Sequence, residues 1–329
     1  MINFEYIRAA SAKGAIDART KNAASQFIAG GTNLVDLMKK GVTTPQRLID
    51  INGLPLNTIT HDAKGLTIGA LVPNSAAADH ELVKTKFPLL SMALNAGASA
   101  QLRNMATVGG NIMQRTRCSY FYDTTMPCNK RQPGSGCGAK DGYNRMHAIF
   151  GASDKCIAVH PSDMCVALAA LNATVLVSGS KGDKKIPFAD FHRLPGSTPE
   201  LDNNLQPGEL ITGVHLPANN FNKYYYLKIR DRLSYAFALV SVAVALEVKD
   251  GVIKSAAMAM GGVAHKPWRL KEAEERLVSL AANKETIGQP LESIATAAMQ
   301  GANTYAHNGY KVKLGKAAIR EAVTRALFS

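Results

Sequence analysis

The sequence predicts an α+β fold, because two different patterns follow one another along the 329 residues. In the first two thirds, short segments with strand character alternate with helical ones. Near residues 218–223 the pattern changes to three long strands of antiparallel type, and two helices follow. We therefore predict an N-terminal domain at 1–220, with subdomains at about 1–55 and 56–220, and a C-terminal α+β domain at 221–329.

The first hundred residues supply the alternating elements. Strands are expected at 25–29, 46–51 and 66–70, and helices at 33–40 and 87–96. Glycines at 41 and 97 follow the two helices, as is common where a helix ends. Residues 101–112 are glycine-rich and are interpreted as a turn that leads into a segment rich in cysteine.

The remaining elements follow in order. A short strand from Cys156 is expected to end at His160-Pro161, and Ser162 is placed to cap the N-terminus of the next helix. His160 and His147 are interpreted as hydrogen-bonding residues of a turn or core. Further strands are expected at 173–178, 223–227, 237–248 and 252–260, with a hairpin turn at 249–251. Helices at 288–303 and 314–327 complete the chain.

Charge and hydropathy argue against several classes of protein. The net charge is +13, but the basic residues are dispersed and form no Lys/Arg block of the kind that binds nucleic acid. We interpret them as a basic surface that docks on acidic protein partners. No apolar run reaches the roughly 20 residues of a membrane span, and the N-terminus does not have the pattern of a secretory signal.

Two glycine-rich loops are candidate binding sites for an anion. The first is Ala29-Gly-Gly-Thr-Asn33 between a strand and a helix, and the second is Thr107-Val-Gly-Gly-Asn111. Consecutive glycines allow backbone N–H groups to approach a phosphate without a Cβ atom in the way. Neither loop is a P-loop or a GxGxxG fingerprint. Each loop taken alone is typical of an ordinary turn. The two loops together suggest a binding site in which backbone groups hold one long diphosphate.

All five cysteines lie between positions 118 and 165, which points to a metal or cluster site. The odd number and uneven spacing do not suit a disulfide framework. Cys118, Cys128, Cys137 and Cys156 lie in or beside an irregular segment at about 113–157, and we predict that they are the ligands. Cys165 lies in an apolar helix and is interpreted as a core residue. Zinc is the alternative to iron–sulfur, although the CxxC pairs of most structural zinc sites are absent.

The two loops also carry a resemblance to a known family. The segments F-I-A-G-G-T-N-L and Q-L-R-N-M-A-T-V-G-G-N-I resemble the FAD-binding medium subunits of the xanthine dehydrogenase family of molybdenum hydroxylases. His160-Pro-Ser-Asp163, Leu205-Gln-Pro-Gly-Glu-Leu-Ile and Lys228-Ile-Arg-Asp-Arg extend the resemblance over nearly the whole chain. It implies an FAD-binding domain of the vanillyl-alcohol-oxidase (PCMH) type. The C-terminal domain would have an antiparallel sheet and helices, as in CO dehydrogenase flavoproteins.

The resemblance also implies roles for individual residues, and none of them is catalytic. The FAD diphosphate would be held by Ala29, Gly30, Gly31, Thr32, Asn33, Leu34, Thr107, Gly110 and Asn111. Ser162 and Asp163 would face the adenine and ribose end or the neighbouring phosphates. Lys228 would lie near the isoalloxazine ring. The chain departs from the common pattern at Leu233-Ser-Tyr235-Ala, where many members have an acidic residue.

Most medium subunits have no cysteine segment at this point. The subgroup with one resembles the flavin subunits of bacterial aldehyde oxidoreductases, the better match, and of 4-hydroxybenzoyl-CoA reductase, in which the segment holds a 4Fe–4S cluster. We therefore expect an electron-transfer subunit of a heterotrimer with a large molybdenum subunit and a small 2Fe–2S subunit. It would pass electrons to an external acceptor.

Two alternatives to this function are kept. One is the flavin subunit of a 4-hydroxybenzoyl-CoA reductase-like enzyme, and the other is a zinc-stabilised basic nucleic-acid-binding protein. The expected location of the heterotrimer is the periplasm, by export together with a signal-bearing partner, or the cytoplasm.

Overall fold

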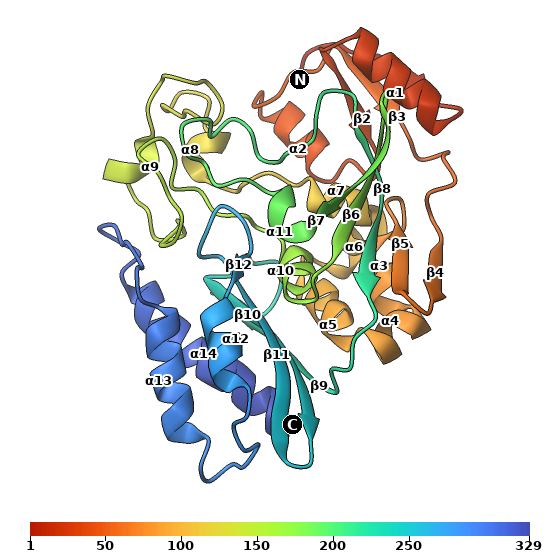
Figure 1. Cartoon of the computed structure of the whole chain (residues 1–329). Coiled ribbons are helices and arrows are strands. Elements are labelled where there is room, and N and C mark those ends of the chain that lie inside the picture. The colour runs from red at the N-terminus through yellow and green to blue at the C-terminus, as the bar shows by residue number, and fades with distance from the viewer.

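Three sheets follow one another along the chain in the computed structural model, which describes residues 1–329 (Figure 1). The first sheet has three parallel strands in the order β1-β3-β2. Helix α1 packs on it, and the Ser11 hydroxyl caps this helix by accepting from the Gly14 N–H at 3.1 Å. The elements of this part are β1 (Glu5–Arg8), α1 (Ala12–Lys21), β2 (Ser25–Ile28), α2 (Leu34–Lys39) and β3 (Arg47–Asp50).

The second sheet has five antiparallel strands in the order β4-β5-β8-β6-β7. Its apolar face and the helices around it form the largest core of the molecule, with 36 buried residues. The strands are β4 (Ile59–Asp62), β5 (Gly65–Gly69), β6 (Thr174–Gly179), β7 (Gly182–Pro187) and β8 (Leu210–Pro217). The helices are α3 (Asn74–Asp79), α4 (Glu81–Lys86), α5 (Pro88–Ala96), α6 (Ala100–Met105), α7 (Val108–Ile112), α10 (Asp163–Ala170) and α11 (Phe188–Phe191).

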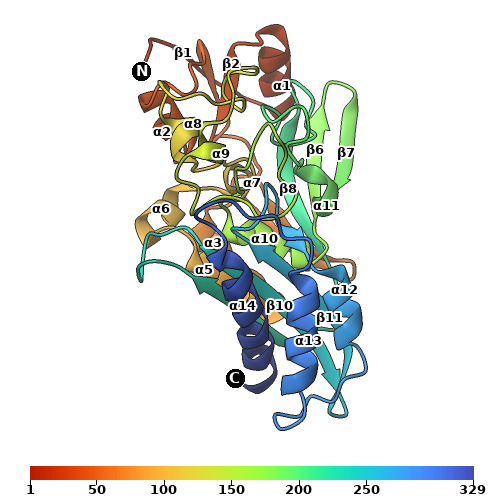
Figure 2. The same cartoon turned by 90° about the vertical axis from the view of Figure 1, so that its left-hand side faces the viewer.

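The third sheet has four antiparallel strands in the order β12-β11-β10-β9. Helices α12 and α14 pack on one face, whereas α5 and α10 contact the strands from the other side (Figures 1 and 2). Because all eight residues of α10 are buried, this helix is the centre of the molecule. The elements are β9 (Lys223–Ile229), β10 (Val240–Lys249), β11 (Val252–Gly261), β12 (Trp268–Arg269), α12 (Lys271–Leu277), α13 (Gly288–Ala298) and α14 (Tyr310–Phe328).

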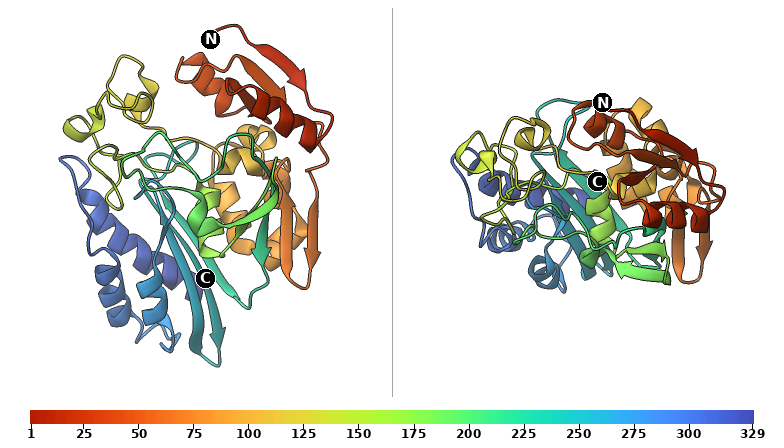
Figure 3. Two further views of the ribbon diagram at one scale, coloured as in Figure 1. Left: turned by 45° about the horizontal axis from the view of Figure 1, so that its top comes forward. Right: turned by 90° about the horizontal axis from the view of Figure 1, so that it is seen from above.

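The cysteine segment has little regular structure and connects two distant parts of the chain. It contains only α8 (Ser119–Tyr122) and α9 (Gly138–Asp141). Phe121 and Cys128 form a small core with Leu37 of α2, while Asn144 accepts from the His307 N–H at 2.9 Å. Figure 3 shows this segment, in yellow, beside the blue C-terminal helices.

The predicted elements occur in the predicted order with two local errors, and several further elements, among them α1, β8 and α12, were not predicted. Residues 101–112, expected as a turn, form most of α6 and all of α7, and the Ser99 and Thr107 hydroxyls cap these short helices. The strand expected from Cys156 to His160 is absent, because the segment crosses from the cysteine loop to α10 without pairing to a sheet. No helix is long and apolar enough to cross a membrane.

Candidate functional site

The two glycine loops lie against each other and line one open cavity of about 1730 Å³, here called the glycine cavity. A Cβ atom on Gly30 would lie 1.7 Å from the Met105 carbonyl oxygen, so only glycine permits this contact. Gly31 has φ +71°, a conformation that glycine adopts without strain. The predicted residues that line this cavity are Ala29, Gly30, Gly31, Thr32, Asn33, Leu34, Thr107 and Gly110.

The first loop offers free hydrogen-bond donors, whereas most donors of the second are used within the protein. The backbone N–H groups of residues 30–33 donate to no protein acceptor. In the second loop, Gly109 N–H donates to the Ala70 carbonyl at 2.8 Å and Gly110 N–H to the Thr107 hydroxyl at 3.2 Å. Four successive free N–H groups form a concave site for an anion. The first loop is therefore the better candidate for holding a diphosphate.

A second cavity of about 970 Å³, here called the central cavity, lies between the cysteine segment, the start of α10 and the third sheet. The predicted residues Ser162 and Asp163 line it. The Ser162 hydroxyl caps α10 by accepting from the Cys165 N–H at 3.0 Å, and it donates to Asn111 Oδ1 at 2.7 Å. Asn111, which lines neither cavity, thus connects the second glycine loop to the central cavity. The others that line it are Thr116, Arg117, Cys118, Ser119, Tyr143, Met146, His147, Val159, His160, Pro161, Phe237, Ala238, Ser241, Gly261 and Gly262.

Lys228 lies behind the central cavity and does not line it. Its ammonium group is 2.8 Å from Asp163 Oδ2 and donates to the Ala96 carbonyl at 2.9 Å. The Tyr226 hydroxyl donates to Asp163 Oδ1 at 2.8 Å, and burial raises the pKa of this tyrosine well above its usual value. Both carboxylate oxygens of Asp163 are therefore occupied by protein donors. Lys228 contributes to the site by fixing Asp163 at the start of α10.

The four predicted metal ligands line a third, very small cavity, here called the cysteine cavity. Cys118, Cys128, Cys137 and Cys156 come from separate turns of the loop and form no disulfide. Burial raises the pKa of Cys118 to about 12 and that of Cys156 to about 11, so these two are thiols unless a cation binds them. Cys165 is fully buried in α10 and lies outside this cavity, as predicted.

Asn129 shapes the cysteine loop. Its side-chain oxygen accepts from the N–H groups of Gly134 and Gly136 at 3.1 and 2.9 Å, and its amide donates to the Lys155 carbonyl at 3.0 Å. These bonds hold the turn between Cys128 and Cys137 against the segment that precedes Cys156. This role was not predicted from the sequence, because an asparagine among glycines is typical of any turn.

The sulfur atoms are spaced more widely than a single zinc ion requires. Three ligand atoms of His, Cys or carboxylate type lie within 4.8 Å of one another only at His160, Cys165 and His192. Tetrahedral zinc, with Zn–S bonds of about 2.3 Å, would bring its sulfurs to roughly 3.8 Å. The cysteine sulfurs as placed therefore do not match the geometry of one tetrahedral zinc ion.

His160 and His192 lie side by side in the interior, and each has one ring nitrogen bonded to the backbone and one without a hydrogen-bond partner. His192 Nε2 donates to the Ile112 carbonyl at 2.9 Å, which leaves its Nδ1 as an acceptor. The Ser162 N–H donates to His160 Nδ1 at 3.3 Å, so the proton of a neutral His160 is on Nε2. Burial lowers both pKa values, that of His192 to about 4, and both rings are neutral. The two ring centroids are 4.3 Å apart, and no hydrogen bond joins the rings.

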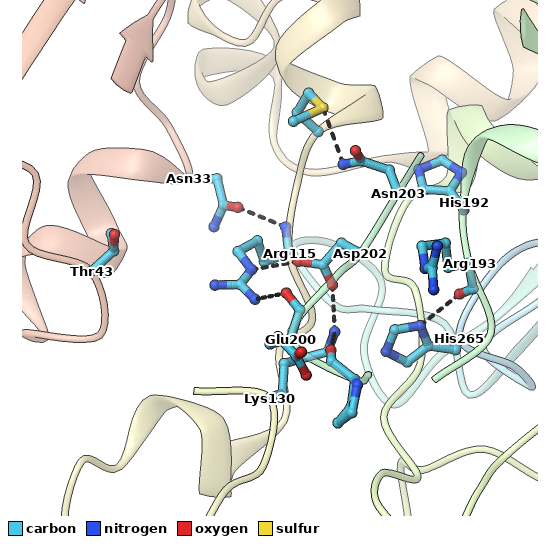
Figure 4. Close-up of polar contacts among 12 residues, drawn as sticks. Asn33, Thr43, Arg115, Lys130, His192, Arg193, Glu200, Asp202, Asn203 and His265 are labelled. Atoms are coloured by element: carbon cyan, nitrogen blue, oxygen red, sulfur yellow. Dashed lines mark hydrogen bonds and ion pairs between the residues drawn. The ribbon is translucent and has the colours of Figure 1, made fainter. Parts of the chain in front are cut away.

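A buried ion-pair network that sequence analysis missed connects the cysteine cavity to the glycine cavity (Figure 4). Asp202 accepts from Arg115 Nε at 2.6 Å and from Lys130 Nζ at 2.5 Å. Lys130 also donates to the Pro199 carbonyl at 2.7 Å, and its side chain is 1% exposed. The two cations hold the pKa of Asp202 far below its usual value, although burial opposes the shift. In the sequence, the only indication of a carboxylate partner is the excess of basic over acidic residues at 113–157.

Two family models match successive parts of the chain. A family model described as "FAD binding domain in molybdopterin dehydrogenase" matches residues 2–219. The model of the "CO dehydrogenase flavoprotein C-terminal domain" matches residues 224–326.

Two relatives are similar over most of their length. The aldehyde oxidoreductase FAD-binding subunit PaoB of Escherichia coli is 49% identical over 304 residues, which are 92% of this chain and 91% of that protein. The glyceraldehyde dehydrogenase medium chain of Sulfolobus acidocaldarius is 30% identical and covers 86% of this chain and 84% of its own length.

Solved structures show the same fold. A reconstituted CO dehydrogenase from Oligotropha carboxidovorans superposes with a TM-score of 0.76 at 24% identity, covering 99% of both chains. The family and the fold class predicted from the two glycine loops are thereby confirmed. The chain carries an FAD-binding domain and belongs to the FAD-binding medium subunits of the molybdenum hydroxylase family of oxidoreductases.

Proposed function

We propose that this chain is an electron-transfer subunit that holds FAD and a 4Fe–4S cluster in a molybdenum-dependent aldehyde oxidoreductase. One observation carries the proposal: four cysteines from separate turns line one cavity, and Cys118 lines the central cavity as well. A cluster held by the cysteines would therefore lie next to the central cavity, which Ser162 and Asp163 also line.

The glycine and central cavities fit FAD. The free N–H groups of residues 30–33 suit its diphosphate, since an anion would satisfy donors that have no protein partner. Ser162 and Asn111 bond to each other between the two cavities, where an extended ligand would pass from one to the other. FAD, when bound, supplies the capacity to exchange electrons one or two at a time. The protein's part is to bind and orient it.

The cysteine cavity fits an anionic iron–sulfur centre. Lys130 and Lys155 line it together with the four cysteines, and the Lys130 charge lowers the pKa of Cys156 against the effect of burial. The wide spacing of the sulfurs favours a polynuclear cluster over zinc. Both features support Cys118, Cys128, Cys137 and Cys156 as the ligands.

The partners and substrate are inferred from the relatives. PaoB is named as a subunit of an aldehyde oxidoreductase, and at 49% identity we assign an aldehyde as the substrate of the whole complex. A large molybdenum subunit would oxidise it, and a small subunit with 2Fe–2S clusters would deliver the electrons to this chain. The complex would pass them to an external acceptor. We place it in the periplasm, by export with a signal-bearing partner, or in the cytoplasm.

The first test is a visible spectrum of protein purified without air, with flavin, iron, sulfide and zinc assayed on the same sample. We expect flavin bands with a broad shoulder, and about four iron and four sulfide per FAD. Flavin without metal would refute the cluster and leave the family assignment intact. Zinc without sulfide would refute the cluster and support a structural metal site.

A further inference from the structure

His147 lies between the cysteine cavity and the central cavity. Its side chain lines the central cavity, and its Nε2 atom is 3.1 Å from Cys118 Sγ. Cys118 lines both cavities. His147 is 4% exposed, so water does not compete for this contact. It is the one side-chain nitrogen within hydrogen-bond distance of a proposed ligand sulfur.

The environment of the ring fixes which nitrogen carries the proton. His147 Nδ1 is buried and has no hydrogen-bond partner. A proton there would be buried without an acceptor, which costs free energy. The single proton of a neutral ring is therefore on Nε2, and it points at the sulfur.

The backbone of His147 is held from several sides. Its N–H donates to the Asn144 carbonyl at 3.0 Å, and its carbonyl accepts from Asn308 Nδ2 at 3.3 Å as well as from Lys311. Lys311 and Asn308 are fully buried, and Lys311 also donates to the Gly262 carbonyl at 2.6 Å. These bonds place the ring without using either ring nitrogen, which leaves Nε2 free to serve the sulfur.

We propose that His147 is a positioning residue that sets the reduction potential of the cluster by donating its Nε2–H to the Cys118 thiolate. A hydrogen bond to a ligand sulfur stabilises the more negative, reduced state and so raises the potential. This inference rests on the proposed cluster and assigns one of its determinants to a side chain. It also identifies Cys118 as the proposed ligand that lines the central cavity.

The test compares two substitutions in the intact complex. His147→Phe removes the donor but keeps a flat ring, whereas His147→Gln keeps an amide N–H. We measure the midpoint potential and the EPR signal of the reduced cluster, together with iron and FAD content. His147→Phe should shift the midpoint to a lower potential at unchanged iron, and His147→Gln should shift it less. The exposed His307, changed to Gln, serves as the control and should leave the midpoint unchanged.

Three outcomes would overturn the inference. The first is an unchanged midpoint potential of the cluster in His147→Phe at full iron content. The second is an equal shift of this potential in both variants, which would indicate that packing and not the N–H donor sets it. If His147→Phe loses its iron, wild-type complex labelled with ¹⁵N-histidine decides. Pulsed EPR should then detect a histidine nitrogen coupled to the cluster in the wild type and none in His147→Gln. The absence of this coupling in the wild type is the third outcome. Wild-type complex without iron would instead refute the proposed function.

Discussion

At the scale of single residues, the five cysteines separate into two environments. Cys128 lines the cysteine cavity, whereas Cys165 is enclosed in α10 beside the main core. We predict that Cys128→Ser lowers the iron content at least fourfold, since three thiolates and a poor ligand hold a cluster weakly, and that Cys165→Ala keeps it. Iron and sulfide assays on protein purified without air check this. Equal losses in both variants would contradict the ligand assignment.

Gly30 tests the glycine cavity in the same way. Alanine there would place Cβ against the Met105 carbonyl and push the two glycine loops apart. We expect Gly30→Ala to weaken FAD binding by at least tenfold, measured by flavin fluorescence during titration of the apoprotein. Gly53→Ala is the matched control, because a Cβ at Gly53 meets no atom within 4 Å and its φ is ordinary. Wild-type affinity in Gly30→Ala would argue against this cavity as the diphosphate site.

At the scale of elements, the Asp202 network joins the cysteine loop to the wall of the glycine cavity. Asp202→Asn removes the charge partner of Lys130, which is almost fully buried. A fully buried pair costs about 3–5 kcal/mol to break, and because Asp202 is 24% exposed we expect roughly 2–3 kcal/mol. Urea unfolding at pH 7 measures this loss. A difference below about 0.5 kcal/mol would show that the network is not a structural link.

The same pair predicts a dependence on pH. The pKa of Asp202 is lower in the folded protein than its unfolded value of about 3.9. The stability that the carboxylate contributes is therefore fully present above about pH 4 and is lost as the pH falls toward the folded pKa. The difference in free energy of unfolding between wild type and Asp202→Asn should be large at pH 7 and shrink near pH 3. A difference that is constant between these pH values would assign the effect to packing instead of charge.

Elements with a strong local pattern could be predicted, whereas those held by distant contacts could not. The hairpin at Lys249-Asp-Gly251 was predicted because Asp250 and Gly251 suit its positive φ values of 53° and 71°. Residues 101–112 were assigned to a turn, because glycine and asparagine obscure two short helices that serine and threonine caps define. The segment from Cys156 has strand-like residues, but it pairs with no sheet since it must reach the cysteine cavity.

At the scale of the whole molecule, the sequence singled out segments that line three cavities but not how these segments meet. The glycine loops, Ser162-Asp163 and the cysteines each carry a local motif. Their arrangement into three adjoining cavities depends on contacts between residues far apart in the chain, such as Arg115 with Asp202 or His147 with Cys118. Such pairs have no local signature, and a lone aspartate or histidine is typical of many surfaces and cores. For the same reason the ion pair of Lys228 with Asp163 was not predicted.

The cysteine segment connects the N-terminal helix α2 to the C-terminal helix α14, so removing its metal should affect the whole molecule. The segment contacts Leu37 of α2 through Phe121, and the Tyr310 hydroxyl of α14 donates to the Arg145 carbonyl at 3.1 Å. Without a cluster, two buried cysteines, two partly buried ones and the charge of Lys130 would remain around one cavity. We predict that chelation of the iron loosens this segment before it affects the sheets.

Limited trypsin digestion measures this loosening. Arg131, which lies between the exposed residues 123–127 and 132–134, should be cut first in iron-depleted protein and resist cleavage in intact protein. Its guanidinium donates to the Tyr120 and Phe121 carbonyls at 2.9 and 2.8 Å, bonds that must break before a protease can bind. Cys165→Ala protein, which should keep its iron, is the control. Cleavage at equal rates with and without iron would mean that the fold holds this segment by itself, and that the cluster serves electron transfer alone.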